Sequence, residues 1–145
     1  MSAQVLQPPG WARPRGYVNG MAASGRQVFV AGMIGWDPQC RFQDDTLAGQ
    51  VGQALRNVVA VLAEAGARPE HLVRLTWYVT SRDEYLEQLP RIGAEYRAVL
   101  GRHFPAMSVV QVVALVEARA KVEIEATAVV PEGGSPTGPG SGAPP

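Results

Sequence analysis

The chain has 145 residues, which is enough for one domain with a hydrophobic core. Its 13 lysines and arginines balance its 13 aspartates and glutamates, so no net positive charge favours nucleic acid or an acidic membrane as a partner. It has one cysteine, Cys40, which excludes an internal disulfide, and no apolar run approaches the ~20 residues of a membrane span. Because the first residues also lack the charged and apolar regions of a signal peptide, we expect a cytoplasmic protein.

The first half of the chain predicts two strands and a helix. Residues 17–23 and 27–34 are rich in apolar side chains and are separated by a turn at Ser24-Gly25. In residues 46–66 the apolar side chains recur at three- and four-residue spacing, which is one face of a helix. That face consists of Leu47, Val51, Leu55, Val58 and Leu62.

The second half predicts a strand, a helical segment and two further strands. Residues 71–80 alternate as a strand does, and residues 81–100 form a helical segment in which Pro90 marks either a kink or the first turn of the main helix. Residues 107–116 are apolar on both alternations, which is typical of a central strand covered on both faces. Residues 121–130 alternate instead, so one face of this strand belongs to the core and the other carries two carboxylates.

The resulting order is ββαβαββ, an α+β fold in which both helical segments cross over onto one face of a mixed sheet. The opposite face is then uncovered, although strand 107–116 is apolar there as well. Since an apolar sheet face rarely stays in water, we expect self-association through it. This domain, residues 1–131, precedes a tail at 132–145 that is nearly all Gly, Pro, Ser, Thr and Ala, and we expect the tail to be disordered.

Four short motifs stand out: VAGMI at residues 30–34, WYVT at 77–80, FPAMSVVQV at 104–112 and VEIEA at 122–126. Together they resemble the RidA/YjgF family of enamine/imine deaminases, over about residues 15–130. The resemblance implies a chorismate-mutase-like fold and a homotrimer whose sheets form a central barrel, with small-molecule sites between subunits. It also implies hydrolysis of a reactive enamine or imine intermediate, with release of ammonia and without a cofactor.

Five positions of the family's ligand site can be carried over to this chain. Tyr17 matches the family's early tyrosine, and Glu123 matches the first glutamate of its Glu-Ile-Glu motif, which is thought to position the attacking water. The other three positions depart from the family. Ala31 stands in place of a serine, Met107 in place of the arginine that grips the substrate carboxylate, and Val109 in place of a frequent cysteine. The resemblance therefore implies Tyr17 and Glu123 as catalytic residues, with Tyr17 and the three altered positions binding the substrate.

The loss of the arginine changes what such a site can bind. A guanidinium holds a carboxylate with two charge-assisted hydrogen bonds, whereas the thioether of Met107 has no donor. A 2-imino acid would lose on the order of 1.5–3 kcal/mol for each of these bonds. The family's site asparagine falls near Leu89 or Pro90. Ala31 and Val109 change the site in the same direction as Met107, so we expect a less charged or larger ligand.

Each of these residues also has an ordinary structural explanation. Glu123 is either a general acid/base that binds water or a solvated strand residue, and Tyr17 either donates to the ligand or packs in its strand. Arg119, in the turn before the last strand, either replaces the missing charge from a neighbouring subunit or is solvated. His71 and His103 lack the spacing of paired ligands, so no metal site is expected.

Three functions follow from these interpretations. The first is an enamine/imine hydrolase whose substrate depends less on a carboxylate. The alternative is a trimer of the same fold that binds a small metabolite without turnover, which the altered site positions favour. The third is that of an endoribonuclease or translation inhibitor, an activity attributed to some relatives. The balanced charge and the scattered basic residues argue against the third function.

Overall fold

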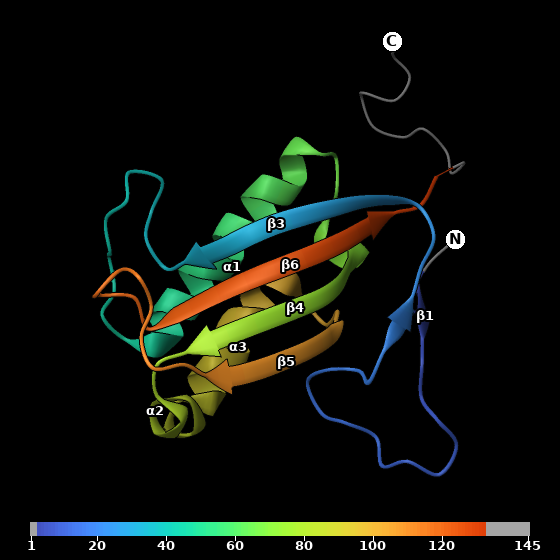
Figure 1. Ribbon diagram of the computed structural model, residues 1–145, viewed down its shortest axis with the longest axis horizontal. Helices are drawn as coiled ribbons and strands as arrows, with labels where there is room; N and C mark the ends of the chain where they lie inside the picture. The colour runs from blue at the N-terminus through green and yellow to red at the C-terminus, as the bar shows by residue number, and fades with distance from the viewer. Residues whose placement is uncertain (1–2, 133–145) are drawn as a thin grey trace.

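A four-stranded mixed sheet with its helices on one face forms the body of the molecule (Figure 1). The structure, a computed structural model, describes residues 3–132. In chain order its elements are β1 (Gln4–Val5), β2 (Met21–Ala22), β3 (Arg26–Ile34), α1 (Leu47–Glu64), the short 3₁₀ helix η1 (Pro69–His71), β4 (Leu72–Val79), α2 (Arg82–Glu87), α3 (Leu89–Leu100), β5 (Ala106–Gln111) and β6 (Val122–Val130). Of the predicted tail, residues 132–145, only Glu132 lies among the described residues.

The strand order explains why the helices share one face. The order is β3-β6-β4-β5, in which β6 is antiparallel to β3 and β4, and β5 is parallel to β4. α1 connects β3 to β4, and α2 with α3 connects β4 to β5, so both connections are crossovers of the same hand. In Figure 1 the helices lie behind the sheet, and the predicted α+β fold with helices on one face is confirmed.

The core lies between the sheet and the two longer helices. The predicted apolar face of α1 is buried, and each of its side chains is at most 1% exposed: Leu47, Val51, Leu55, Val58 and Leu62. Burying a side chain of this size contributes roughly 1.5–3 kcal/mol. Thr46 caps the helix by accepting a hydrogen bond from the Gly49 N–H at 3.0 Å. None of the helices in residues 3–132 has the length and apolar character to cross a membrane.

The proline in the second helical segment lies in a first turn and not at a kink. The segment consists of two helices, α2 and α3, which meet at Gln88. Ser81 caps α2 by accepting a hydrogen bond from the Glu84 N–H at 3.1 Å. Pro90 then falls in the first turn of α3, where the N–H that proline lacks would have no partner within the helix.

The prediction of a central strand over residues 107–116 was wrong. β5 ends at Gln111 and is an edge strand, and residues 112–121 form a loop in which two valines are almost fully exposed. Only alternate residues of β5, Met107 and Val109, pack against the core. A half-buried strand is followed directly by an apolar loop, and in the sequence the two together resemble one buried strand.

The predicted strand over residues 17–23 is largely absent. Only Met21–Ala22 lies in a ladder, and it pairs with β1 and not with the main sheet. This two-stranded ribbon stands at one end of the molecule (Figure 1). The Val18 N–H, which donates to the Pro105 carbonyl at 3.2 Å, joins the segment to the body. β1 was not predicted, because two residues are too few to show a period.

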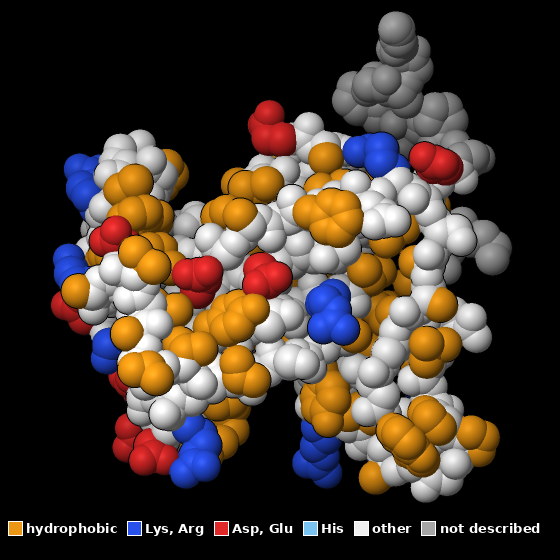
Figure 2. Space-filling model, viewed as in Figure 1, with side chains coloured by type: hydrophobic (Ala, Val, Ile, Leu, Met, Phe, Trp, Pro, Cys, Tyr) orange, Lys and Arg blue, Asp and Glu red, His pale blue; other side chains and the backbone are white. Residues whose placement is uncertain are grey.

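The sheet face away from the helices is uncovered, as predicted, but its centre is polar and not apolar. Along β4 and β6 this face carries Arg74, Thr76, Tyr78, Glu123, Glu125 and Thr127. Figure 2 shows charged side chains near the middle of this face, with hydrophobic ones around them. Phe29 and Val110, which are 71% and 46% exposed, lie on the two edge strands. Apolarity alone therefore does not predict self-association through this face.

Candidate functional site

Glu123 lies on the uncovered face of β6, beside a bulge in β3. In the bulge, Ala31 and Gly32 together stand opposite the single residue Glu125. The Glu123 carboxylate rests against the backbone of Gly32, where a Cβ would overlap its Oε2. Only glycine leaves this space open. Glu123 forms no hydrogen bond or ion pair within residues 3–132, so its oxygens are free to accept from water or a ligand.

Glu125, two residues further along β6, accepts a hydrogen bond within the chain. The Tyr78 hydroxyl on β4 donates a hydrogen bond to its Oε1 at 2.7 Å. This hydrogen bond is the main cause that raises the pKa of Tyr78, with further contributions from burial and the two negative charges nearby. The hydroxyl therefore remains a protonated donor. The face holds one engaged carboxylate and one free carboxylate.

Met107 and Val109 lie on the opposite face of the sheet from Glu123. They pair in register with Leu75 and Trp77 of β4, whose side chains are buried under the helices. Residues that stand opposite each other in a ladder share a face, so Met107 and Val109 point toward the helix side at the edge of the sheet. One chain alone therefore cannot place Met107 and Glu123 around a single small ligand.

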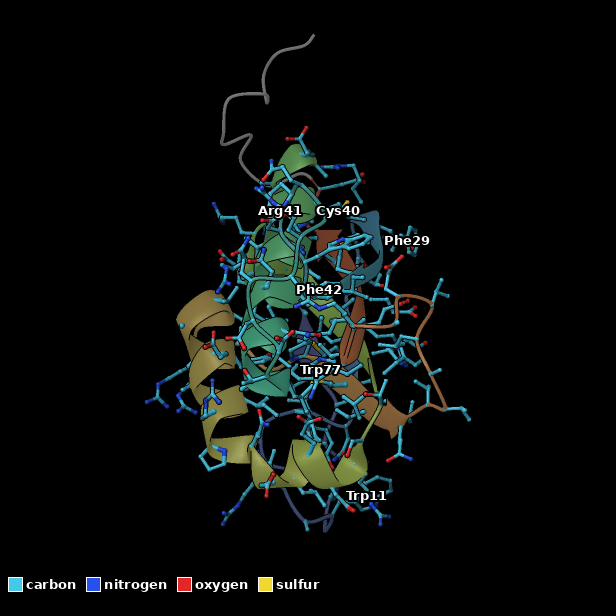
Figure 3. The ribbon with its side chains drawn as sticks, turned by 90° about the vertical axis from the view of Figure 1, so that its left-hand side faces the viewer. Trp11, Phe29, Cys40, Arg41, Phe42 and Trp77 are labelled. Atoms are coloured by element: carbon cyan, nitrogen blue, oxygen red, sulfur yellow. The ribbon has the colours of Figure 1, made fainter. Side chains whose placement is uncertain are left out.

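Stacked aromatic rings lie under the helices on the same sheet face, starting from Trp77, the ladder partner of Val109. Trp77 stacks on Tyr96 with ring centroids 6.4 Å apart, and Tyr96 stacks on Phe104 with centroids 5.3 Å apart. Tyr85 meets Trp77 edge-on at 6.4 Å, and burial raises the pKa of both tyrosines, so they stay neutral. In Figure 3, Trp77 lies inside the molecule, whereas Phe29 projects from the sheet away from the helices. Sequence reasoning missed this aromatic wall, although Trp77 falls on the inward alternation of its strand.

Tyr17 and Ala31 lie in different parts of the molecule. Ala31 is exposed in the β3 bulge, near Glu123. Tyr17 is 40% exposed, and its neighbour Val18 holds it beside the first residue of β5. Along the strands, that residue is four positions, or about 13 Å, from the level of Glu123. Within one chain the predicted site residues thus form two groups, Ala31 with Glu123 and Met107 with Val109, and Tyr17 lies nearer the second group, because Val18 bridges to Ala106, the residue before Met107.

Two surface cavities lie against the loop of residues 112–121, with volumes of about 520 and 350 Å³. Neither cavity contains any of the five residues that the sequence predicted for the site. Arg119 lines both, and its guanidinium donates to Asp45 at 2.5 Å and lies 5.1 Å above the centre of the Phe42 ring. The charge of Arg119 is therefore already engaged within its own chain.

Both histidines are tied to the backbone. His71 Nδ1 accepts from the Arg68 N–H at 3.0 Å, and His103 Nε2 lies 2.7 Å from the Leu72 carbonyl oxygen. Burial lowers the pKa of His71. Within residues 3–132 no group of three or more His, Cys, Asp or Glu side chains is placed to hold a metal ion.

Known proteins match this chain over most of its length. A family model described as "Endoribonuclease L-PSP" matches residues 11–130. A 2-iminobutanoate/2-iminopropanoate deaminase from Salmonella typhimurium is 33% identical over 116 residues, which are 78% of this chain and 86% of the relative. The solved structure of YyfB, a Rid-family protein of unknown function from Yersinia pestis, is 32% identical with a TM-score of 0.77, covering 90% of this chain and all of its own. That of Rv2704 from Mycobacterium tuberculosis, of the YjgF/YER057c/UK114 family, is 33% identical with a TM-score of 0.60, covering 80% and 88%.

Proposed function

Because this chain belongs to the RidA/YjgF family, we propose that it hydrolyses an enamine or imine and releases ammonia. The proposal rests on the surroundings of the Glu123 carboxylate. Its carboxylate has no partner within residues 3–132 and rests on the bare backbone of Gly32. A carboxylate held in this way can accept a hydrogen bond from water and direct the water oxygen at a bound substrate.

The reaction adds one water molecule across the C=N bond. The water oxygen attacks the carbon of the protonated imine, C=NH2+, while one water proton passes to Glu123, which gives a neutral carbinolamine. Glu123 returns that proton to the nitrogen, the C–N bond breaks with its electron pair on the nitrogen, and ammonia leaves. The hydroxyl gives its proton to solvent and becomes the carbonyl. An enamine enters the same route after it is protonated on carbon. No electrons are transferred to or from the substrate, so the proposed reaction needs no redox cofactor.

The proposed site is shared between two copies of the chain. Glu123 and Gly32 would come from the uncovered face of one copy, and Met107 and Val109 from the helix side of the β5 edge of another. The opposite orientation of these two pairs within one sheet supports this arrangement. A homotrimer closes head-to-tail contacts of this kind into a ring. The small-molecule ligand then lies at the subunit interface.

The wall around Met107 supports a substrate that depends less on a carboxylate. Met107 and Val109 offer no charged donor, and Leu89 is an exposed apolar residue at the first position of α3. A polarizable thioether on the same sheet face as the buried Trp77, which stacks on Tyr96, suits an apolar or aromatic substituent. We therefore propose an imine with such a substituent as the substrate class.

Ammonia release from a matched pair of imines tests the proposal. One is 2-iminobutanoate, and the other carries a phenyl group in place of the carboxylate. We expect wild-type protein to give the higher kcat/KM with the phenyl imine. Glu123→Gln should lower this value by about 10²–10⁴-fold, the usual contribution of a positioned acid/base group. Wild-type protein that accelerates neither reaction would contradict the proposal.

A second candidate is a trimer that binds a small metabolite without turnover. The replacement of three polar or reactive family residues at Ala31, Met107 and Val109 favours it. A saturable rise in Tm with the same imines or their ketone products, without ammonia release, supports this candidate. Activity that Glu123→Gln abolishes rules it out.

A further inference from the structure

Tyr78, Glu123 and Glu125 form a cluster on the uncovered sheet face. In the register of β4 and β6, Tyr78 stands directly opposite Glu123, and Thr76 stands opposite Glu125. The Tyr78 hydroxyl nevertheless reaches the diagonal partner and donates to Glu125 Oε1 at 2.7 Å. The proposed mechanism uses Glu123 and leaves this hydrogen bond without a role.

The hydrogen bond makes two otherwise similar carboxylates different. Glu123 and Glu125 are alternate residues of one strand, so their side chains leave the same face about 7 Å apart. Either could bind water. A phenol has one proton to donate, so Tyr78 can hold only one of them. It holds Glu125, and the lone pairs of Glu123 remain free.

Among the neighbouring groups, Tyr78 is the one that makes Glu123 and Glu125 different from each other. Arg74 lies on the same face, in register with Thr127, and forms no ion pair within the described residues 3–132. Gly32 presents only backbone to Glu123. Within the described chain, the Tyr78 hydroxyl is the one side-chain donor that touches either carboxylate.

We propose that Tyr78 is a positioning residue for the hydrolysis: by occupying Glu125, its hydroxyl leaves Glu123 as the carboxylate that binds the attacking water. The inference rests on the proposed function. Without the hydroxyl, water would bridge the two carboxylates or bind at Glu125, away from the place that Gly32 opens beside Glu123. Fewer enzyme molecules would then hold water in the attacking position, and kcat would fall while KM stays the same.

A double-mutant cycle tests the role directly. Tyr78→Phe keeps the ring and removes the hydroxyl, and we expect it to lower kcat roughly 5–20-fold with little change in KM. Glu125→Leu removes the competing carboxylate. In that background Tyr78→Phe should have no further effect, because the hydroxyl has nothing left to occupy. Thr76→Val, on the same strand and face, is the matched control and should retain wild-type kcat.

Two outcomes would overturn the role while the enzyme remains active: an unchanged kcat in Tyr78→Phe, or losses that multiply in the double variant. Wild-type protein that is inactive on every imine overturns the proposed function, and the positioning role falls with it.

The hydrogen bond between the Tyr78 hydroxyl and the Glu125 carboxylate can also be tested without an activity assay. Tyrosinate absorbance followed against pH should show one tyrosine of the wild type ionising at lower pH in Glu125→Leu, because the main cause that raises the pKa of Tyr78 is gone. An identical titration in the two proteins means that the pair does not exist in solution, and the proposal is then wrong.

Discussion

Met107 is the residue at which the predicted site departs most from the pattern that the family resemblance implies. It is half-buried on the helix side of edge strand β5, so a longer side chain there can extend past the edge into solvent or a ligand. We expect Met107→Arg to raise kcat/KM for 2-iminobutanoate at least tenfold, because each new charge-assisted hydrogen bond contributes about 1.5–3 kcal/mol. Steady-state kinetics with Met107→Leu as the size-matched control measures this gain. A folded Met107→Arg protein without any gain would show that Met107 does not face the substrate.

Gly32 affects the proposed reaction only through the space that it leaves for Glu123. A Cβ at this position would overlap the Glu123 carboxylate, which must then move, although the flexible glutamate lets the fold accommodate the change. We expect Gly32→Ala to lower kcat at least about tenfold with little change in Tm. Gly93→Ala adds the same methyl group in α3, where the nearest atom is Arg97 Nη1 at 3.2 Å, and should retain full activity. Equal kcat in the two variants would show that Glu123 does not act from its place beside Gly32.

At the scale of elements, one buried side chain joins α1 to the loop before β6. Gln50 is fully buried, and its Nε2 donates to the carbonyls of Asp44 and Arg119, both at 3.1 Å. Its Oε1 accepts from the Lys121 N–H at 2.8 Å. Gln50→Leu would leave these backbone groups unpaired, and we expect the free energy of unfolding to fall by roughly 2–4 kcal/mol.

Urea denaturation measures this loss, with Gln53→Leu as the control. The Gln53 amide bonds only within its own helix and is half-buried, so its loss should change the stability by less than about 0.5 kcal/mol. If Gln50→Leu unfolds at the same urea concentration as the control, the loop before β6 does not depend on the hydrogen bonds of the Gln50 amide.

Helices and strands with one clear hydrophobic period were predictable from the sequence. Contacts that depend on the pairing register between strands were not. The 3.6-residue period gave the buried face of α1, and the alternation of Ile124 with Glu123 gave both faces of β6. Residues 107–116 failed because valines in an edge strand and in an exposed loop have the same hydrophobicity. The contact of Gly32 with Glu123, and the turn of Met107 to the other face, are set by pairing between strands far apart in the chain. No local pattern encodes that pairing.

At the scale of the whole molecule, exposed apolar residues occur on several sides of the single chain. Trp11 is exposed near the N-terminal ribbon, Phe29 on the outer strand β3, and Val113 and Val116 in the loop after β5. A ring in which each copy meets two others needs contact surfaces on more than one side. We therefore expect sedimentation equilibrium to give three times the mass of one chain. A monomer at micromolar concentration would contradict both the ring and the shared site.

The opposite faces of Met107 and Glu123 lead to a sharper test, in which two inactive variants restore each other. Glu123→Gln lacks the carboxylate that we propose to bind the attacking water, and Met107→Trp fills the apolar part of the proposed site, so each should be inactive alone. If every site takes Met107 from one copy and Glu123 from the next, random equimolar mixing leaves about one site in four intact. The first copy must then be a Glu123→Gln chain and the second a Met107→Trp chain, each with a probability of about one half.

We expect co-refolded mixtures to recover about a quarter of wild-type activity, measured as ammonia release. The same proteins mixed without subunit exchange should recover none, which is the control. If both residues served one site within a single chain, every chain of the mixture would lack one of them. Mixed oligomers without activity would therefore place the whole site within one copy, against the geometry of the sheet.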